Sequence, residues 1–214
     1  MEQNYHSIYK HYESKLAQHG ANHLGVDWPS QKDLDVRFNI MAALTKISKS
    51  EEKFSLLDLG CGVGLYVEYL NKTNQYQSVN YFGVDISSEM IAHARQLHPN
   101  DSFEVRDILT TPIQDNSYDF VIMNGLLTEK VTLTQEDMIE FAQKIITAAF
   151  KICSKGICFN VMSSHVDWTR DDLFHWPLDN LMSFLVKDVS RHVVIRSDYG
   201  LYEYSVYVYK SSNQ

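Results

Sequence analysis

The stretch LLDLGCGVG, residues 56–64, combines an apolar run, an aspartate and three closely spaced glycines. Gly60, Gly62 and Gly64 permit positive φ angles and let a ligand approach the backbone closely. A G-x-G-x-x-G loop would present N–H groups to a dinucleotide pyrophosphate, but here the third glycine comes one position early. Asp58 would also repel that anion. The stretch therefore indicates a ligand that carries positive charge near Asp58.

Two further acids stand at the ends of predicted strands. Asp85, in YFGVDIS, follows the glycines at the distance where an acid accepts hydrogen bonds from ribose hydroxyls, and Ile86 comes directly after it. Asp107, in FEVRDIL, is placed to accept from an adenine amino group, with Ile108 packed on the ring. Because parallel strands end at one edge of a sheet, these acids are predicted to share one ligand. The alternative is that Asp85 only caps the following helix.

These motifs resemble those of class I methyltransferases that use S-adenosylmethionine. LLDLGCGVG is similar to the first motif of that family, VDIS to the second, VRDI to the third and YDFVIMNGLL to the fourth. The resemblance covers roughly residues 54–210 and implies a sulfonium cofactor with an ammonium and a carboxylate, and S-adenosylhomocysteine as product. The implied cofactor contacts are Asp58, Gly60, Cys61, Gly62, Gly64, Asp85, Ile86, Asp107, Ile108 and Asn124. Cys61 is interpreted as a space-filling residue and not as a nucleophile.

The N-terminal segment is predicted to cover the cofactor. Tyr5, Tyr9 and Tyr12 recur at helical spacing, and aromatic faces stabilise a cation by ~0.5–2 kcal/mol. An N-terminal helix often closes over the cofactor in small-molecule methyltransferases of this class, and this segment looks similar. We expect Tyr9 to contact the cofactor and Tyr5 the substrate, and Trp28 and Arg37 to reach the methionine carboxylate. Packing of the stripe against the sheet is the alternative.

Candidate catalytic residues lie in SSHVDWTRDDLFHWP, residues 163–177, after the fifth predicted strand. Methyl transfer depends on positioning, and a hydroxyl or ammonium acceptor also needs a base. His165 is the first candidate for that base and His175 the second, while Asp167 and Trp168 are predicted substrate contacts. The alternative is a solvated loop with ordinary surface histidines. No metal site is expected, because the loop offers no third convergent ligand.

The elements that must position these residues alternate between strands and helices. Predicted strands cover 54–59, 79–84, 102–105, 118–123 and 156–162, and predicted helices cover 62–72, 87–97, 134–152 and about 177–187. RHVVIRS and LYEYSVYVYK are expected to form two strands joined by a tight turn. The predicted fold is α/β: a Rossmann-like, doubly wound, seven-stranded sheet with an antiparallel last strand and an N-terminal helical cap. We expect one methyltransferase domain over 1–214, with the cap in 1–50 and the core in 51–214.

Charge and sequence details limit the classes of molecule that could accept the methyl group. The chain has 214 residues and a formal net charge of -8, which disfavours nucleic acid as a partner. Asn124 is followed by Gly-Leu-Leu and not by the two prolines of enzymes that methylate nucleobase amino groups. The predicted reaction is methyl transfer to oxygen or nitrogen of a small molecule, such as a sugar, a glycan precursor or a specialised metabolite. A protein or RNA methyltransferase, a non-catalytic cofactor-binding partner subunit and, more distantly, an NAD oxidoreductase are the alternatives.

Cysteine content and hydropathy suggest the compartment. Three cysteines without a metal-binding spacing indicate reduced thiols and a cytoplasmic protein. No apolar run approaches the ~20 residues that span a bilayer, so no membrane association is expected. The sequence is compatible with a monomer or a homodimer.

Overall fold

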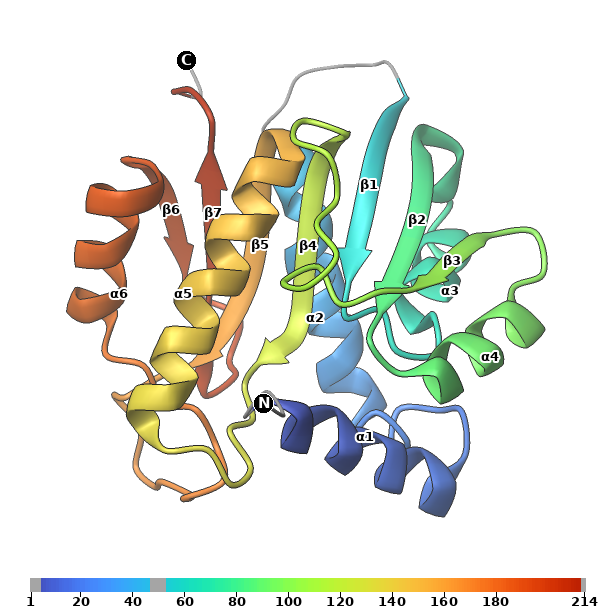
Figure 1. Cartoon of the computed structure of the whole chain (residues 1–214), viewed down its shortest axis with the longest axis horizontal. Coiled ribbons are helices and arrows are strands. Elements are labelled where there is room, and N and C mark those ends of the chain that lie inside the picture. Colours follow the sequence, from blue (N-terminus) through green and yellow to red (C-terminus); the bar gives the residue numbers. More distant parts are fainter. Residues whose placement is uncertain (1–4, 47–52, 213–214) are drawn as a thin grey trace.

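The chain forms one seven-stranded sheet in the order β3-β2-β1-β4-β5-β7-β6 (Figure 1). The computed structural model describes residues 5–46 and 53–212. The strands are β1 (Phe54–Leu59), β2 (Val79–Asp85), β3 (Ser102–Val105), β4 (Tyr118–Leu127), β5 (Cys153–Met162), β6 (His192–Arg196) and β7 (Glu203–Tyr209). Strand β7 is antiparallel to β5 and β6, whereas the other pairings are parallel. This confirms the predicted doubly wound sheet with an antiparallel last strand.

Helices cover both faces of the sheet. They are α1 (His6–His19), α2 (Gln31–Lys46), α3 (Leu65–Lys72), α4 (Ser88–Leu97), α5 (Gln135–Ile152) and α6 (Leu178–Phe184), with a short 3-10 turn at Tyr76–Ser78. Apolar side chains of α2, α3 and α4 pack on one face, and those of α5 and α6 pack on the other. The central strands are therefore buried on both sides, which explains why their sequences are continuous apolar runs.

Side-chain caps fix where several helices begin. Ser30 Oγ accepts from the N–H of Asp33 at 3.2 Å at the start of α2. Thr134 Oγ accepts from the N–H of Asp137 at 3.1 Å at the start of α5. Ser87 Oγ accepts from the N–H of Met90 at 3.2 Å, so Ser87, and not Asp85, caps α4. Asp85 is thus left for another role.

Several predicted boundaries were wrong. Helix α3 begins at Leu65 and not at 62, because the glycines before it hold positive φ angles. Strand β4 continues past 123 to Leu127, through a register irregularity that includes Gly125 at φ +82. Helix α6 is shorter than predicted and continues as one π-helical turn, Leu185–Val189.

The connection between β6 and β7 spans residues 197–202, which is longer than the predicted tight turn. The predicted boundary between the cap and the core, at 50/51, lies outside the described residues.

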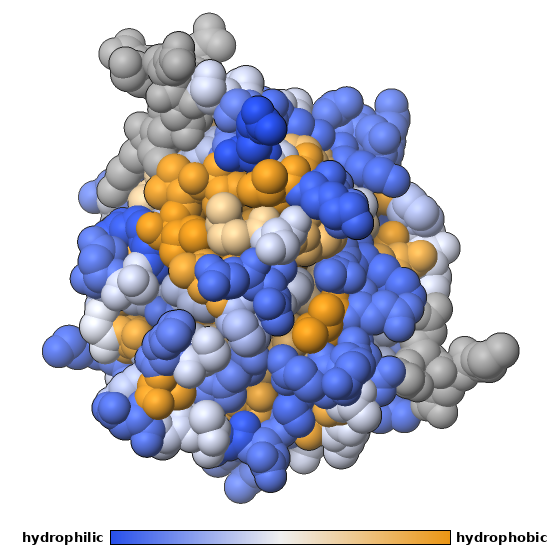
Figure 2. Space-filling model, turned by 90° about the vertical axis from the view of Figure 1, so that its left-hand side faces the viewer, coloured by the Kyte–Doolittle hydropathy of each residue, from blue (hydrophilic) through white to orange (hydrophobic). Residues whose placement is uncertain are grey.

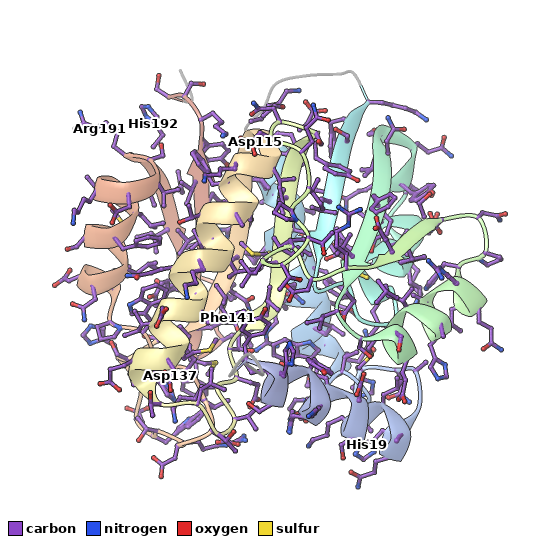
Figure 3. All side chains as sticks on the ribbon, in the orientation of Figure 1. His19, Asp115, Asp137, Phe141, Arg191 and His192 are labelled. Carbon is purple, nitrogen blue, oxygen red and sulfur yellow. The ribbon has the colours of Figure 1, made fainter. Side chains whose placement is uncertain are left out.

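Helix α1 lies across the carboxyl ends of the central strands (Figure 1). Figure 3 places Phe141, on α5, beside the N-terminal end of α1, and His19 at the opposite end of that helix. The ring of Tyr5, directly before α1, stacks on Phe141 with 4.9 Å between ring centroids. Gly20, at φ +75, ends α1 by donating its N–H to Leu16 O. The N-terminal helix is therefore held against α5 above the strand ends.

The surface at the β6 edge of the sheet carries an exposed apolar area. Figure 2, which faces the side where α6 and β6 lie, shows a broad apolar area in its upper half. Val186 and Val194, which belong to the π-helical turn and β6, are 47% and 38% exposed. This area lies away from α1 (Figure 1). Within residues 5–46 and 53–212, no helix has the length and apolar character needed to cross a bilayer.

Candidate active site

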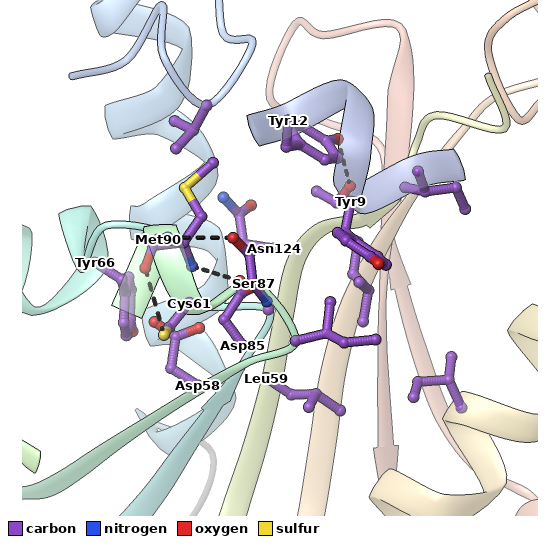
Figure 4. A pocket seen from close by; sticks show the side chains of 18 of the residues that line it. Tyr9, Tyr12, Asp58, Leu59, Cys61, Tyr66, Asp85, Ser87, Met90 and Asn124 are labelled. Carbon is purple, nitrogen blue, oxygen red and sulfur yellow. Dashed lines mark hydrogen bonds between the residues drawn. The ribbon is translucent and has the colours of Figure 1, made fainter. Parts of the chain in front are cut away.

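A cavity lies where the carboxyl ends of β1, β2 and β4 meet the underside of α1 (Figure 4). The sheet side contributes acids and the glycine loop, while the cover contributes aromatic rings from the N-terminal segment. The predicted cofactor residues that line it are Asp58, Gly60, Cys61, Gly62, Asp85, Ile86, Asp107, Ile108, Asn124, Tyr9 and Trp28. Segments far apart in sequence are thus brought together in the way the strand order predicts.

The glycine loop is fastened to the neighbouring strand. The N–H groups of Gly60 and Cys61 both donate to Val84 O, at 2.8 and 3.1 Å. Gly60 and Gly62 hold φ angles of +78° and +53°. A Cβ on Gly62 would meet Val26 Cγ1 at 3.3 Å, so the loop passes close under the N-terminal cover. The positive φ angles favour glycine at both positions, and the space left for a side chain is narrow.

Gly64 has a different role from the one predicted. Gly64 does not line the cavity; it precedes α3 at φ +84, where a Cβ would meet the His98 ring at 2.8 Å. This glycine lets α3 pack closely against the end of α4. Cys61 does line the cavity, and burial raises the pKa of its thiol well above the usual value. An uncharged, buried thiol agrees with the interpretation of Cys61 as a space-filling residue.

Asp58 is a buried acid at the tip of β1. It is 3% exposed and accepts a hydrogen bond from the Tyr81 hydroxyl at 2.7 Å. Burial raises the pKa of Asp58 to about 7, and the nearby charge of Asp85 adds to the effect, against the opposing hydrogen bond from Tyr81. A cationic ligand group would offset this cost, because it favours the ionised carboxylate.

Asp85 is held rigidly by the backbone around it. Its two carboxylate oxygens accept from the N–H groups of Gly62 and Ser87, both at 2.9 Å. Burial raises its pKa, and these backbone hydrogen bonds partly oppose that shift. Each oxygen keeps a further lone pair, so the carboxylate can still accept from two ligand hydroxyls.

Asp107 contacts the N-terminal segment. Its Oδ1 accepts from the N–H of Leu109 at 2.9 Å, and its Oδ2 accepts from the Tyr5 hydroxyl at 2.7 Å. Burial, together with Asp107, raises the pKa of Tyr5, which keeps the hydroxyl protonated as a donor. Tyr5 therefore lies at the end of the cavity predicted to take adenine, and this placement does not favour the predicted substrate contact.

Asn124, on β4, presents an unsatisfied acceptor. Its Oδ1 is buried and has no hydrogen-bond partner among the described residues, and the side chain lines the cavity (Figure 4). Such an atom is costly unless a ligand supplies a donor. Asp58 and Asn124 both line the cavity with acceptor oxygens, so the cavity suits a ligand that carries N–H donors and positive charge.

Comparison with known proteins identifies the kind of domain. Residues 56–151 match the family described as methyltransferase domain. The Mycobacterium tuberculosis protein Rv1506c, named as a methyltransferase without a substrate, is 27% identical over 172 residues, which is 78% of this chain and 99% of that protein. Trans-aconitate 2-methyltransferase of Variovorax paradoxus is 37% identical over 76 residues, 36% of this chain and 29% of that enzyme.

Solved structures share the fold at low sequence identity. Magnesium protoporphyrin IX methyltransferase from Synechocystis PCC 6803, crystallised with S-adenosylhomocysteine, has a TM-score of 0.64 at 14% identity and covers 98% of this chain and 97% of that one. A methyltransferase from Leishmania major has a TM-score of 0.63 at 15% identity, with 97% and 83% covered. Residues 56–151 therefore form a methyltransferase domain, and the fold of the whole chain is that of S-adenosylmethionine-dependent methyltransferases.

The hydrogen-bond acceptors that line the cavity suit S-adenosylmethionine. The ammonium of S-adenosylmethionine would supply a cation for Asp58 and an N–H donor for Asn124 Oδ1. Asp85 has free lone pairs for the ribose hydroxyls. The cover fits as well, since Tyr9, Tyr12 and Trp28 line the cavity and aromatic rings stabilise a cation such as a sulfonium.

The structure does not bring Arg37 into the cavity of the methyltransferase. Its Nε donates to Glu203 Oε2 at 2.9 Å, and its guanidinium lies 4.0 Å from the centroid of the Trp28 ring. Glu203 also accepts from Asn160 Nδ2 at 3.1 Å, and Asn160 Oδ1 accepts from the N–H of Gly125 at 2.8 Å. Arg37 is thus already paired with a buried acid, and its guanidinium packs on the ring of Trp28.

The loop at 163–177 also lies outside the cavity. His165, Asp167 and Trp168 are exposed, and none of them lines it. The reason is that the second half of the loop pairs with the chain after β4: Phe174 N–H donates to Thr128 O, and Lys130 N–H donates to Asp172 O, both at 2.8 Å.

His175, the second candidate base, is also directed elsewhere. Its Nδ1 lies 2.6 Å from Ser163 O, and its ring meets Trp168 edge-on. The structure therefore does not favour either histidine as the base.

Sequence reasoning missed Glu129. This acid lies two residues beyond β4, is 9% exposed, and its Oε2 is buried without a partner among the described residues. Burial, together with the charges of Asp27 and Asp172, raises the pKa of Glu129 to about 7. Prediction of β4 as ending at 123 hid this position, because Glu129 would then have been an ordinary loop residue. The apolar residues Leu126 and Leu127 were the sequence feature that could have indicated a strand continuing to 127.

Proposed function

We propose that this methyltransferase transfers the methyl group of S-adenosylmethionine to an oxygen or nitrogen atom of a small molecule. The observation that carries the proposal is the cover of the cavity. Tyr5, Tyr9, Tyr12 and Trp28 from the N-terminal segment line the cavity on the side opposite the strand ends, so the acceptor shares a covered cavity with the cofactor. A sugar, a glycan precursor or a specialised metabolite suits such a covered site better than a broad macromolecular surface does.

Relatives of the domain support a small acceptor. One is named trans-aconitate 2-methyltransferase and another magnesium protoporphyrin IX methyltransferase. Malonyl-[acyl-carrier protein] O-methyltransferase of Pectobacterium atrosepticum, 30% identical over 81 residues, is named for an acyl group on a carrier. These names favour small organic groups as acceptors, and they differ enough that they favour no single one.

In this proposal the protein acts by placing and enclosing the reactants. When bound, S-adenosylmethionine supplies an electrophilic methyl group on a sulfonium. Asp85 orients the ribose, and Asp58 and Asn124 hold the ammonium end, so that the methyl group is presented in a fixed direction. The aromatic cover excludes water and favours the cation.

The first test is calorimetric titration of S-adenosylmethionine into the wild type, Asp85→Ala and Asp115→Ala. Asp115 is an exposed acid at the opposite end of the sheet from α1 (Figure 3), so it is a matched control. Binding by the wild type and by Asp115→Ala, with loss in Asp85→Ala, is expected. Absence of binding to the wild type would overturn the proposal.

The second test identifies the acceptor class. Formation of S-adenosylhomocysteine is measured with pools of small hydroxyl and amine acceptors, with total protein and with RNA. Turnover with a small-molecule pool is the expected result. Turnover only with protein or RNA would favour a macromolecular substrate, and binding without turnover in any pool would favour a non-catalytic subunit.

A further inference from the structure

We propose that His11, Asp27 and Glu129 bind one divalent transition-metal ion, with Zn²⁺ as the preferred ion. His11 lies on α1, Asp27 on the loop between α1 and α2, and Glu129 after β4. The possible ligand atoms of these side chains lie within 4.8 Å of one another. One imidazole and two carboxylates form the kind of nitrogen and oxygen set that Zn²⁺ accepts, with room for a further ligand.

The unpartnered oxygen of Glu129 is the observation that points to a ligand. Glu129 is 9% exposed, and its Oε2 is buried without a hydrogen-bond partner among the described residues. Within the part of the chain that the structure describes, Lys130 Nζ lies against Leu133 O, and Arg170 is bound to Asp172, so neither cation is directed to this oxygen. A buried carboxylate in this position is stabilised by a cation or a donor from outside the chain.

The other two ligands are already oriented. His11 Nε2 lies 2.7 Å from Asp27 Oδ2, and Lys15 Nζ lies 2.8 Å from Asp27 Oδ1. Lys15 thus holds one carboxylate oxygen and leaves the other turned toward His11, which is how an outer partner orients a metal ligand. When His11 binds a metal as a neutral imidazole, Asp27 and Glu129 carry two negative charges and Lys15 carries one positive charge. A divalent ion would offset that excess.

The position of the site gives it a role in closing the cover. Tyr12, which follows His11, and Val26 and Trp28, which flank Asp27, all line the cofactor cavity. An ion held by His11, Asp27 and Glu129 would tie α1 and the following loop to the chain after β4. Because binding effects are reciprocal, such an ion would also raise the affinity for S-adenosylmethionine. The sequence predicted no metal site, and none of the three ligands belongs to loop 163–177, although Leu173 of that loop forms a β-bridge with Glu129.

The test is calorimetric titration of ZnCl₂ into untagged protein from which metals have been removed with a chelator. The expected result is one ion bound per chain by the wild type. Loss of an outer partner alone costs about 10–100-fold in metal affinity, so His11→Ala and Glu129→Gln should each weaken binding by at least about 100-fold. His19→Ala, on the same helix, and Glu140→Gln, an exposed acid on α5, are the matched controls and should bind as the wild type does.

This measurement is independent of the proposed function, because neither cofactor nor acceptor is present. Circular dichroism and thermal unfolding show whether each variant is folded. Folded His11→Ala and Glu129→Gln proteins that bind Zn²⁺ as tightly as the wild type would overturn the proposal. A wild type that binds no Zn²⁺ would also overturn the proposal. Titration with Mn²⁺ and Mg²⁺ then shows whether the protein binds another divalent ion or none.

Discussion

At the scale of single residues, two side chains that line the cavity carry buried acceptors with few or no donors in the described structure. Asp58 has one hydrogen bond, from Tyr81, and Asn124 Oδ1 has no partner among the described residues. Desolvation of such groups weakens the free protein, and a ligand with donors recovers the cost. Cofactor affinity is therefore expected to depend on the ionisation of Asp58 and on the amide of Asn124, and each dependence can be measured separately.

The affinity for S-adenosylmethionine should rise with pH and level off above about pH 7. The pKa of Asp58 is raised to about 7 in the free protein, mainly by burial. A bound ammonium favours the carboxylate, so binding below pH 7 releases a proton and becomes weaker as the pH falls. Calorimetry between pH 5.5 and 8 measures this slope. In Asp58→Asn the slope should be much smaller, and an unchanged slope would show that another group titrates.

Replacement of Asn124 by alanine should weaken cofactor binding without weakening the fold. A hydrogen bond to a charged group contributes about 1.5–3 kcal/mol, which corresponds to a loss of about 10–100-fold in affinity. Because Asn124 Oδ1 has no partner in the described structure, the variant loses no hydrogen bond at that atom when the cofactor is absent. Fluorescence or calorimetric titration measures the affinity, with Asn100→Ala, at an exposed turn, as the control. Equal affinity in both variants would argue against contact with Asn124.

At the scale of elements, strand tips were predictable and the folding of long loops was not. Asp58, Asp85 and Asp107 follow from the order of apolar strands, since the carboxyl ends of parallel strands meet at one edge. The turn of Arg37 toward Glu203 could not be read in advance, because the two residues are 166 positions apart and meet only through sheet topology. Glu129 was hidden because β4 was predicted to end at 123, and its neighbours His11 and Asp27 are more than 100 positions away in the sequence.

Loss of His165 should leave methyl transfer nearly unchanged. Removal of a general base costs about 10²–10⁴-fold in rate. His165 is exposed and does not line the cavity, because the loop is paired to the chain after β4. Once an acceptor is known, kcat and KM of His165→Ala are compared with those of the wild type. A drop of about 10²-fold or more in kcat would show that the loop moves over the cavity during the reaction.

The ion pair between α2 and β7 should matter more for stability than for cofactor contact. Arg37 and Glu203 side chains are 10% and 0% exposed. Arg37→Met leaves a buried carboxylate without its cation, and breaking such a pair costs about 3–5 kcal/mol. Urea unfolding measures this loss, and Glu203→Gln in the Arg37→Met background should recover part of it. If Arg37 held the methionine carboxylate instead, affinity would fall and stability would change little.

At the scale of the whole molecule, the cofactor cavity lies between a sheet edge and an N-terminal cover that hydrogen-bonds to the core. Tyr5 to Asp107 and Tyr12 to Gly125 are hydrogen bonds between the cover and the core, at 2.7 and 3.4 Å. Ser87 to Glu13, at 2.6 Å, is a third. A ligand enclosed between these surfaces contacts both of them, so its binding energy should appear as stability of the whole fold.

Saturating S-adenosylmethionine should therefore raise the melting temperature, and by more at pH 7.5 than at pH 5.5. A ligand at about 100 times its Kd adds about 2.7 kcal/mol, which is about 5–10 °C for a chain of this size. Because the pKa of Asp58 is raised on folding, its contribution to stability is present at low pH and is lost as the pH rises through about 7. As the pH rises through about 7, the free protein should thus become less stable, while the stabilisation by bound cofactor increases. Thermal unfolding of the wild type and Asp58→Asn, each with and without cofactor at both pH values, measures both trends. A cofactor shift that is the same at both pH values in the wild type would place the ammonium away from Asp58.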